Sequence, residues 1–160
     1  MQFSEEEIKA IVTVAQNAGT YVTSHSYTPQ AIQQAIKLGV RGIEHGNLID
    51  LETAQLMAGK KAFLTPTLIA HVMSKQMNFL PPESAAKNDE VLEKGLAAMK
   101  MAVDVGVTVC FGSDLLGPMH FAQSKEFSVR SKVLTPIQIL RSATVNAARL
   151  LMQEDHLGQV

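Results

Sequence analysis

Apolar positions recur along the chain with two periods, one typical of helices and one typical of strands, and the two alternate. The first helical stretch follows Ser4, whose spacing to Glu7 is that of a capping box, and it ends at Gly19. A strand is expected directly afterwards, over residues 20–25, where polar and apolar side chains alternate. The chain therefore opens with a helix that leads into a strand.

The stretch from 21 to 47 predicts one strand–helix–strand unit. Its first strand ends at His25, and its second strand, over 40–45, ends at His45. Between them, the hydroxyl of Thr28 can accept a hydrogen bond from the first free amides of a helix, and Gly39 suits the helix exit. Because consecutive parallel strands point the same way, we expect the two histidines to lie on the same rim of the sheet.

A third unit follows the same order. Asp50 is placed to cap a helix, and a strand is predicted over 62–68. The pattern then loosens over 71–87, a Met-rich and Pro-containing segment that we interpret as a long excursion at the strand-end rim. Apolar spacing predicts a clear helix over 91–106.

The last unit brings a carboxylate to the same rim. A strand is predicted over 107–114, ending at Asp114. A short helix is expected near 121–132, and a longer one from Thr135, at the start of another capping-box pattern, to about Leu151. The order of elements is that of four βα units with no dividing linker.

Four such units favour an α/β fold, either an open sheet or part of a (βα)8 barrel. A full barrel takes about 250 residues, so 160 residues with four strands match about half of one plus terminal helices. We expect residues 1–160 to form a single domain.

The composition excludes several classes of protein. With 46% hydrophobic and 18% charged residues, the chain can bury a sizeable core. Its 14 basic and 15 acidic residues give a net charge of -1, so we expect neither nucleic acid nor a membrane as partner. The single cysteine, Cys110, fits a reducing compartment and is most simply a core residue. The acidic start of the chain and the absence of a long apolar run predict a cytoplasmic protein that acts on small polar molecules.

Four segments together carry a family resemblance: VTSHSYTPQAIQQAIKLGVRGIEHGNLID, TPTL, FGSDLLGPMH and TPIQILRSATVNAARLL. They resemble the metal-dependent amidohydrolase superfamily, in particular its imidazolonepropionase-related branch with prolidase-like and ochratoxinase-like enzymes. The resemblance covers nearly the whole chain. It implies the C-terminal half of a (βα)8 TIM barrel, with strands that correspond to the fifth to eighth.

The resemblance also implies a binuclear metal site. It assigns His25 and His45 to one metal, and it makes Asp114 a ligand of the other metal that takes a proton from the bridging water. The family's first-strand His-x-His pair and carboxylated lysine are expected upstream of Met1. On the residues alone, both histidines could be hydrogen-bonded structural residues, and Asp114 could cap a turn.

Imidazole nitrogen and carboxylate oxygen suit zinc or a similar divalent ion, which makes hydroxide available near neutral pH. The implied reaction is hydrolysis of a C–N bond in a small amide or N-acyl amino acid-like substrate. Tyr27 and His120 are assigned to substrate contact, although Tyr27 could equally be a surface loop residue. Glu126 is assigned either a supporting role behind the metal ligands or a place at the substrate edge, whereas His71 and His156 are interpreted as solvent or packing residues.

Two function classes remain open. In the first, the chain is the C-terminal fragment of a hydrolase and has little activity alone; in the second, it is a catalytically incompetent half-barrel that only folds and self-associates. Four parallel strands leave two open edges and an uncovered inner face, which costs free energy. We therefore expect a homodimer or higher oligomer in either case.

Overall fold

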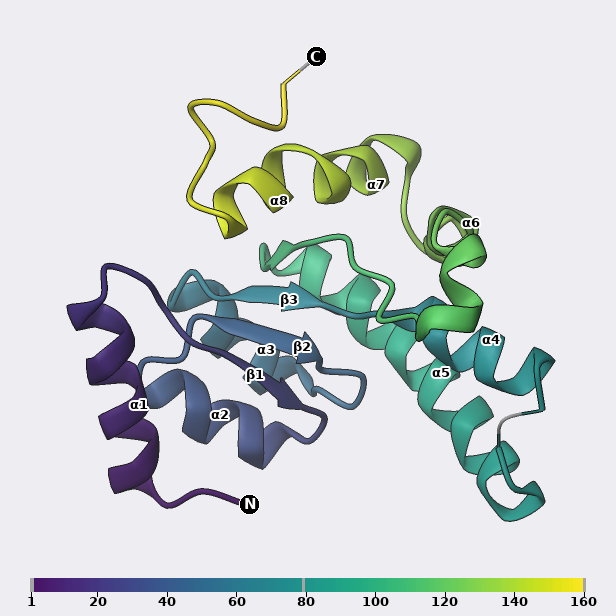
Figure 1. Cartoon of the computed structure of the whole chain (residues 1–160), viewed down its shortest axis with the longest axis horizontal. Coiled ribbons are helices and arrows are strands. Elements are labelled where there is room, and N and C mark those ends of the chain that lie inside the picture. Colours follow the sequence, from purple (N-terminus) through teal and green to yellow (C-terminus); the bar gives the residue numbers. More distant parts are fainter. Residues whose placement is uncertain (1, 79, 160) are drawn as a thin grey trace.

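The computed structural model describes residues 2–78 and 80–159, and it contains a four-stranded sheet in which neighbouring strands are parallel and follow the chain order (Figure 1). The predicted alternation of helix and strand is confirmed. The strands are β1 (Thr23–Ser26), β2 (Gly42–His45), β3 (Phe63–Thr65) and β4 (Thr108–Val109). The helices are α1 (Glu5–Asn17), α2 (Pro29–Lys37), α3 (Leu51–Gly59), α4 (Leu68–Gln76), α5 (Pro82–Asp104), the 3-10 helix η1 (Gly117–Ala122), α6 (Lys125–Arg130), α7 (Pro136–Ala143) and α8 (Val145–Leu150).

Side-chain capping fixes where α1, α3 and α7 begin. Ser4 starts α1 with the predicted capping box, and Thr135 starts α7 in the same way. The carboxylate of Asp50 accepts a hydrogen bond of 2.8 Å from the amide of Thr53 at the start of α3. The prediction for Thr28 was wrong, because its side chain makes no capping bond to α2, which has a proline in its first turn.

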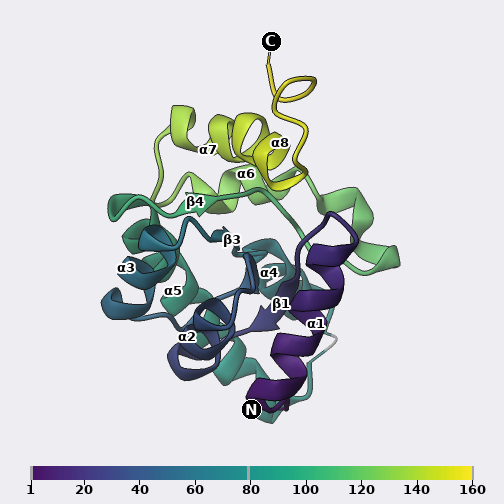
Figure 2. The same ribbon diagram turned by 90° about the vertical axis from the view of Figure 1, so that its left-hand side faces the viewer.

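The core lies between the sheet and the helices that follow each strand. Ile43 and Leu64 face each other in register on β2 and β3, and at 0% and 1% exposure they are sealed by the helix layer. Helices α2, α3 and α5 pack in sequence along this face, while α7 and α8 lie beside β4 (Figures 1 and 2). The side-chain amide of Asn146 donates to the carbonyl of Val109, at 2.9 Å, and so ties α8 to β4.

The predicted loose excursion over 71–87 was wrong, because most of it is helical. Strand β3 stops at Thr65, before a proline that has no amide to donate, and α4 begins three residues later. Helix α5 starts already at Pro82, since a proline is well tolerated in a first helical turn. No helix of the described residues is both long and apolar enough to span a membrane.

The C-terminal elements are shorter than predicted. Of the strand expected over 107–114, only Thr108–Val109 is paired. The helix expected from 135 to 151 is broken at Thr144, which has φ -120° and ψ -96° and separates α7 from α8. The segment near 121–132 begins as a 3-10 turn before α6.

Cys110 is the core residue that the sequence indicated. It is fully buried, and its thiol donates to the carbonyl of Asn146 at 3.5 Å. Burial raises the pKa of this thiol to about 12. The side chain is therefore an inert packing residue rather than a nucleophile.

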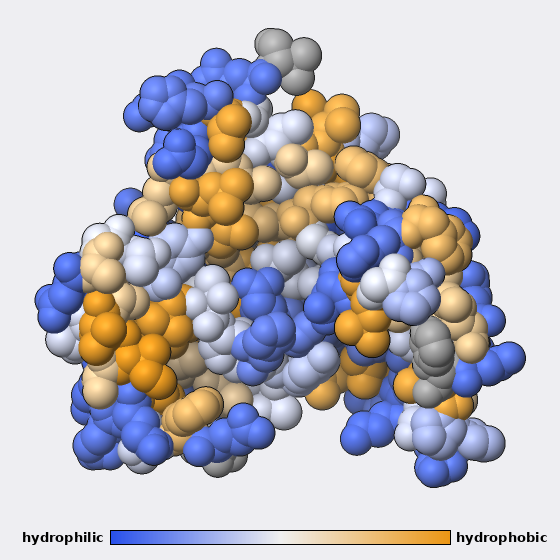
Figure 3. Space-filling model, viewed as in Figure 1, coloured by the Kyte–Doolittle hydropathy of each residue, from blue (hydrophilic) through white to orange (hydrophobic). Residues whose placement is uncertain are grey.

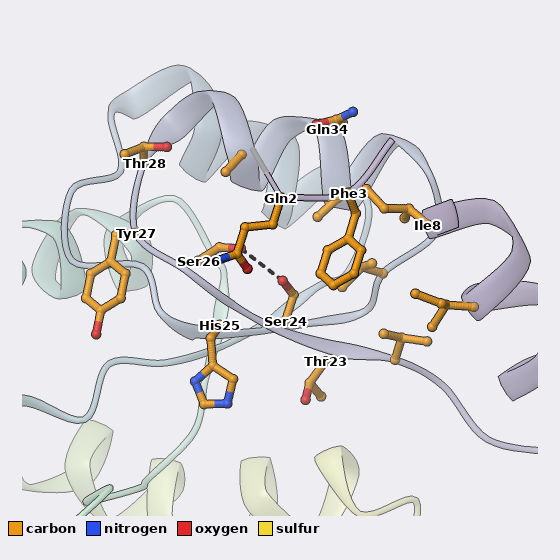
Figure 4. A pocket seen from close by; sticks show the side chains of 15 residues that line it. Gln2, Phe3, Ile8, Thr23, Ser24, His25, Ser26, Tyr27, Thr28 and Gln34 are labelled. Carbon is orange, nitrogen blue, oxygen red and sulfur yellow. Dashed lines mark hydrogen bonds between the residues drawn. The ribbon is translucent and has the colours of Figure 1, made fainter. Parts of the chain in front are cut away.

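The edge at β1 is open, and apolar side chains surround it. Among the described residues, strand β1 pairs only with β2, and a cavity of about 720 Å³ lies between β1, α1 and α2 (Figure 4). Ile11 and Val14 on α1 are 45% and 68% exposed, and Phe3 is 53% exposed. Apolar surface also gathers over α1 and α8 on the face shown in Figure 3. Such surface on one side of a small sheet is typical of an interface.

We propose that a second copy of the chain covers this open side in a two-fold dimer. Light scattering after gel filtration should then report about 35 kDa, twice the 17.3 kDa of one chain. Val14→Lys should shift the population towards monomer, because it places a charge in the contact. Phe121→Lys, at the equally exposed Phe121 of η1, serves as the control. A cooperatively melting 17.3 kDa wild-type monomer at micromolar concentration would contradict the proposal.

Candidate metal centre

Two histidines meet where β1 and β2 end. His25 lies one position before the end of β1, and His45 is the last residue of β2. The parallel register aligns Ser26 with His45, so both rings reach the same rim. Nδ1 of His25 and Nε2 of His45 are 2.9 Å apart. The structure thus brings together the two side chains that the sequence placed on one rim.

The His45 ring is held on three sides. It is 6% exposed, and its Nδ1 lies 2.8 Å from the hydroxyl of Thr67. The ring of Tyr27 stacks on it, with centroids 4.7 Å apart and planes inclined by 12°. Burial lowers the pKa of His45, against an opposing contribution from Asp114 and with a smaller lowering from His25. A neutral ring with one unprotonated nitrogen is the form that binds a metal.

The geometry of the two nitrogens fits a shared metal ion. Around a tetrahedral zinc with bonds of about 2.0–2.1 Å, two nitrogen ligands lie about 3.3 Å apart. The observed 2.9 Å between His25 and His45 needs to widen by only a few tenths of an ångström. Within residues 2–78 and 80–159, however, no three His, Cys, Asp or Glu side chains are close enough together to hold a metal. The described part of the chain therefore offers two nitrogen ligands to such an ion.

Asp114 lies in the loop after β4, on the same side of the sheet as the histidines. Its side chain is exposed, and its negative charge opposes the lowering of the His45 pKa and adds to the raised pKa of Tyr27. It does not join His25 and His45 in a three-residue cluster of metal-binding side chains. The predicted set of His25, His45 and Asp114 thus shares one rim without forming a closed site.

Strained backbone marks the ends of three neighbouring strands. His45, Thr67 and Asp114 have φ values of 74°, 50° and 50°, in the left-handed region that side chains other than glycine rarely adopt. Each follows or ends a different strand, from β2 to β4. Such strain concentrates at functional sites. Thr67 was not identified from the sequence, because the strand predicted over 62–68 contains it, whereas the observed β3 ends at Thr65.

The two residues assigned to substrate contact differ in position. Tyr27 lies against His45 and is 39% exposed, and burial raises its pKa. Figure 4 shows Tyr27 and His25 pointing away from the side of β1 that carries Ser24 and Ser26. His120 is an exposed residue of η1.

His71, interpreted from the sequence as a solvent or packing residue, stands nearer to the histidine pair than expected. Its charge is one of the smaller influences that lower the pKa of His45. Its Nδ1 lies 2.9 Å from the side-chain oxygen of Asn88, and the amide of Asn88 donates to the His71 carbonyl at 2.9 Å. The ring therefore also joins α4 to α5. His156 is an exposed residue near the end of the described chain.

Glu126 does not lie at the substrate edge, which is one of the two positions that the sequence offered for it. It is fully buried, and its carboxylate accepts from Nε of Arg130 and from the amide of Ile69, each at 2.7 Å. Burial raises the pKa of this carboxyl, and the Arg130 guanidinium opposes the shift. Glu126 thus binds the first turn of α4, because the free amides of a helix start favour a negative charge.

One protein-family model matches the whole length of the chain. Residues 1–160 match the model of the Amidohydrolase family. The chain belongs to the amidohydrolase family. The predicted resemblance is confirmed, and membership of this family implies a divalent metal.

Relatives of known structure confirm the fold. The ochratoxinase of Aspergillus niger is 32% identical over 148 residues, which cover 91% of this chain and 31% of that protein. A crystal structure of an amidohydrolase is 46% identical with a TM-score of 0.92, covering 98% of this chain and 39% of the other. A prolidase complexed with N-methylphosphonate-L-proline is 45% identical with a TM-score of 0.93, covering 99% and 40%. The chain thus spans less than half the length of these relatives, and its four βα units are part of a TIM barrel.

Breaking the buried ion pair between Glu126 and Arg130 tests the structural role assigned to Glu126. Glu126→Ala leaves Arg130 as an uncompensated buried charge, so we expect the free energy of unfolding to fall by about 3–5 kcal/mol. Urea denaturation measures the change. The exposed pair of Glu90 and Lys94 provides the control, since Glu90→Ala should leave the denaturation midpoint unchanged. Equal effects of the two substitutions would contradict the assignment.

Proposed function

We propose that this chain supplies part of the active site of a metal-dependent hydrolase that cleaves C–N bonds in small amides. The observation that supports it most is the convergence of His25 Nδ1 and His45 Nε2 at one rim of a parallel sheet in an amidohydrolase-family chain. In this proposal residues 1–160 act as one domain, and zinc is the preferred ion because imidazole nitrogen suits it.

The chain's own residues take distinct roles in this proposal. His25 and His45 hold the ion, which when bound makes hydroxide available near neutral pH. The Asp114 carboxylate accepts a proton from the attacking water and returns it to the leaving nitrogen. Asp114 is exposed on this rim, so both the attacking water and the leaving nitrogen can reach its carboxylate.

The proposed substrate is an N-acyl amino acid or dipeptide. Burial raises the pKa of the Tyr27 phenol, so it stays protonated and can donate a hydrogen bond to a carboxylate or carbonyl of the substrate. His120 is proposed to contact the outer part of the substrate. The prolidase relative, at 45% identity, supports an amide whose nitrogen belongs to an amino acid such as proline.

The second candidate function is that of a self-associating module without catalysis. It is favoured by one observation, that the described residues contain no cluster of three metal-binding side chains. A catalytic zinc site ordinarily has three protein ligands. In the hydrolase proposal the remaining ligands come from outside these 160 residues, and the chain alone binds metal weakly.

A chimera separates the two candidates. The 160 residues replace the matching 40% of the prolidase relative, so that the relative supplies the rest of the barrel. We expect hydrolysis of an Xaa-Pro dipeptide or an N-acyl proline. Asp114→Asn should lower kcat by about 10²–10⁴-fold, because the proton acceptor is lost. His156→Ala, in the exposed C-terminal tail, is the matched control and should retain full activity.

Two outcomes of this experiment would count against the proposal. A folded, metal-loaded chimera without amide hydrolysis would favour the non-catalytic module. Robust turnover by the purified 160-residue chain, abolished by Asp114→Asn, would show that the chain needs no ligands from elsewhere.

A further inference from the structure

Thr67 lies at the start of α4, but its side chain does not cap that helix. It occupies the N-cap position, where a threonine hydroxyl usually accepts from a backbone amide, yet its side chain makes no capping bond. Its hydroxyl oxygen lies 2.8 Å from Nδ1 of His45 instead. The side chain is 5% exposed, so water offers it little alternative.

The backbone at Thr67 is strained, and in this left-handed conformation the hydroxyl lies against the His45 ring. Its φ of 50° and ψ of 43° are left-handed, a conformation that is rare for a β-branched residue. Such a conformation persists only where the surroundings enforce it. A threonine at this position usually caps the helix. Thr67 makes no capping bond and contacts His45 instead.

Neighbouring groups hold the strained residue from both sides. On one side, the side-chain amide of Asn47 donates to the carbonyl of Pro66 at 3.3 Å. On the other, the buried carboxylate of Glu126 accepts from the amide of Ile69 at 2.7 Å and does the capping that Thr67 does not. Arg130 fixes Glu126 in turn, at 2.7 Å. The hydroxyl of Thr67 is therefore set in place before any ligand arrives.

A neutral imidazole carries its single proton on one of two nitrogens. If the Thr67 oxygen accepts from Nδ1–H, the lone pair of His45 lies on Nε2, which is the nitrogen 2.9 Å from His25. If Nε2 carried the proton, it would block the point where the two rings converge. A hydrogen bond at the other ring nitrogen is the usual way in which proteins settle this choice for a metal ligand.

We propose that Thr67 is a positioning residue, which holds His45 in the Nδ1–H tautomer and aims its Nε2 at the position of the metal ion. The inference rests on the proposed function, because it assigns His45 to a metal. It adds a fourth strand end to the site, since Thr67 follows β3, between the strands that lead to His45 and Asp114. The buried Glu126 and Arg130 pair contacts the segment after Thr67 through the amide of Ile69.

Thr67→Val is the decisive variant, because it keeps the β-branched shape and removes the hydroxyl. Nitrogen NMR of the imidazole rings in the metal-free 160-residue chain should show one tautomer of His45 in the wild type and a mixture in Thr67→Val. Calorimetric titration with zinc should show affinity about 10–100-fold weaker in Thr67→Val. Thr67→Ser keeps the hydroxyl and should resemble the wild type in both measurements.

A second variant keeps the test valid if Thr67→Val does not fold. Thr67→Gly removes the hydroxyl and suits the left-handed backbone, so it should fold and lose zinc affinity as Thr67→Val does. Circular dichroism verifies the fold of each variant. Unchanged zinc affinity and an unchanged His45 tautomer in the folded variants would overturn the positioning role.

The same titrations separate this inference from the proposed metal site. His45→Ala should abolish the zinc binding that Thr67→Val weakens. If His45→Ala leaves zinc affinity unchanged, the metal site itself is wrong. If His45→Ala abolishes binding while Thr67→Val and Thr67→Gly bind as tightly as the wild type, the metal site stands and the role of Thr67 fails.

Discussion

The shared direction of the four strands is the constraint on which the site depends. Parallel pairing through β1, β2, β3 and β4 puts every carboxyl end at one rim, whatever residues stand there. The chain places His25, His45 and Asp114 at these ends, together with Thr67. A reversed strand would carry its end residue to the opposite rim, so the site could not form from the same side chains.

Helix α4 connects the buried pair of Glu126 and Arg130 with the histidines at the strand ends. Its first turn is held by Glu126, a carboxylate that is fully enclosed with Arg130, and the residue before that turn touches His45. The desolvation of such a pair is costly, so a buried pair is weak evidence for stability in itself. Its position suggests a structural reason for keeping it, because it fixes a strained segment that bears on the site.

Sequence reasoning succeeded where the signal was local. Capping boxes at Ser4 and Thr135 set two helix starts, and strand-end positions brought His25 and His45 together. Sequence reasoning failed where contacts between segments far apart in the sequence decide the conformation. Pro82, which was taken to mark an irregular excursion, begins α5 instead, and the core around Met73 favours helix in α4 before it.

Sequence reasoning did not anticipate the conformation of Thr67 or the burial of Glu126, and both have the same cause. The left-handed φ of Thr67 and the burial of Glu126 arise from packing between segments almost 60 residues apart, as the bond between Glu126 and Ile69 shows. No local pattern carries that information. The strand predicted over 62–68 contains Thr67, whereas the observed β3 ends at Thr65, so the position of Thr67 beyond a strand end became visible only in the structure.

The central claim is that His25 and His45 share one metal ion at the rim. Anomalous X-ray diffraction at the zinc edge, on crystals of the 160-residue chain grown with zinc, tests it most directly. The account predicts one peak between the rings, about 2.0–2.1 Å from both Nδ1 of His25 and Nε2 of His45. Zinc bound only at His71, His120 or His156, with the two rings still 2.9 Å apart and hydrogen-bonded, would contradict it.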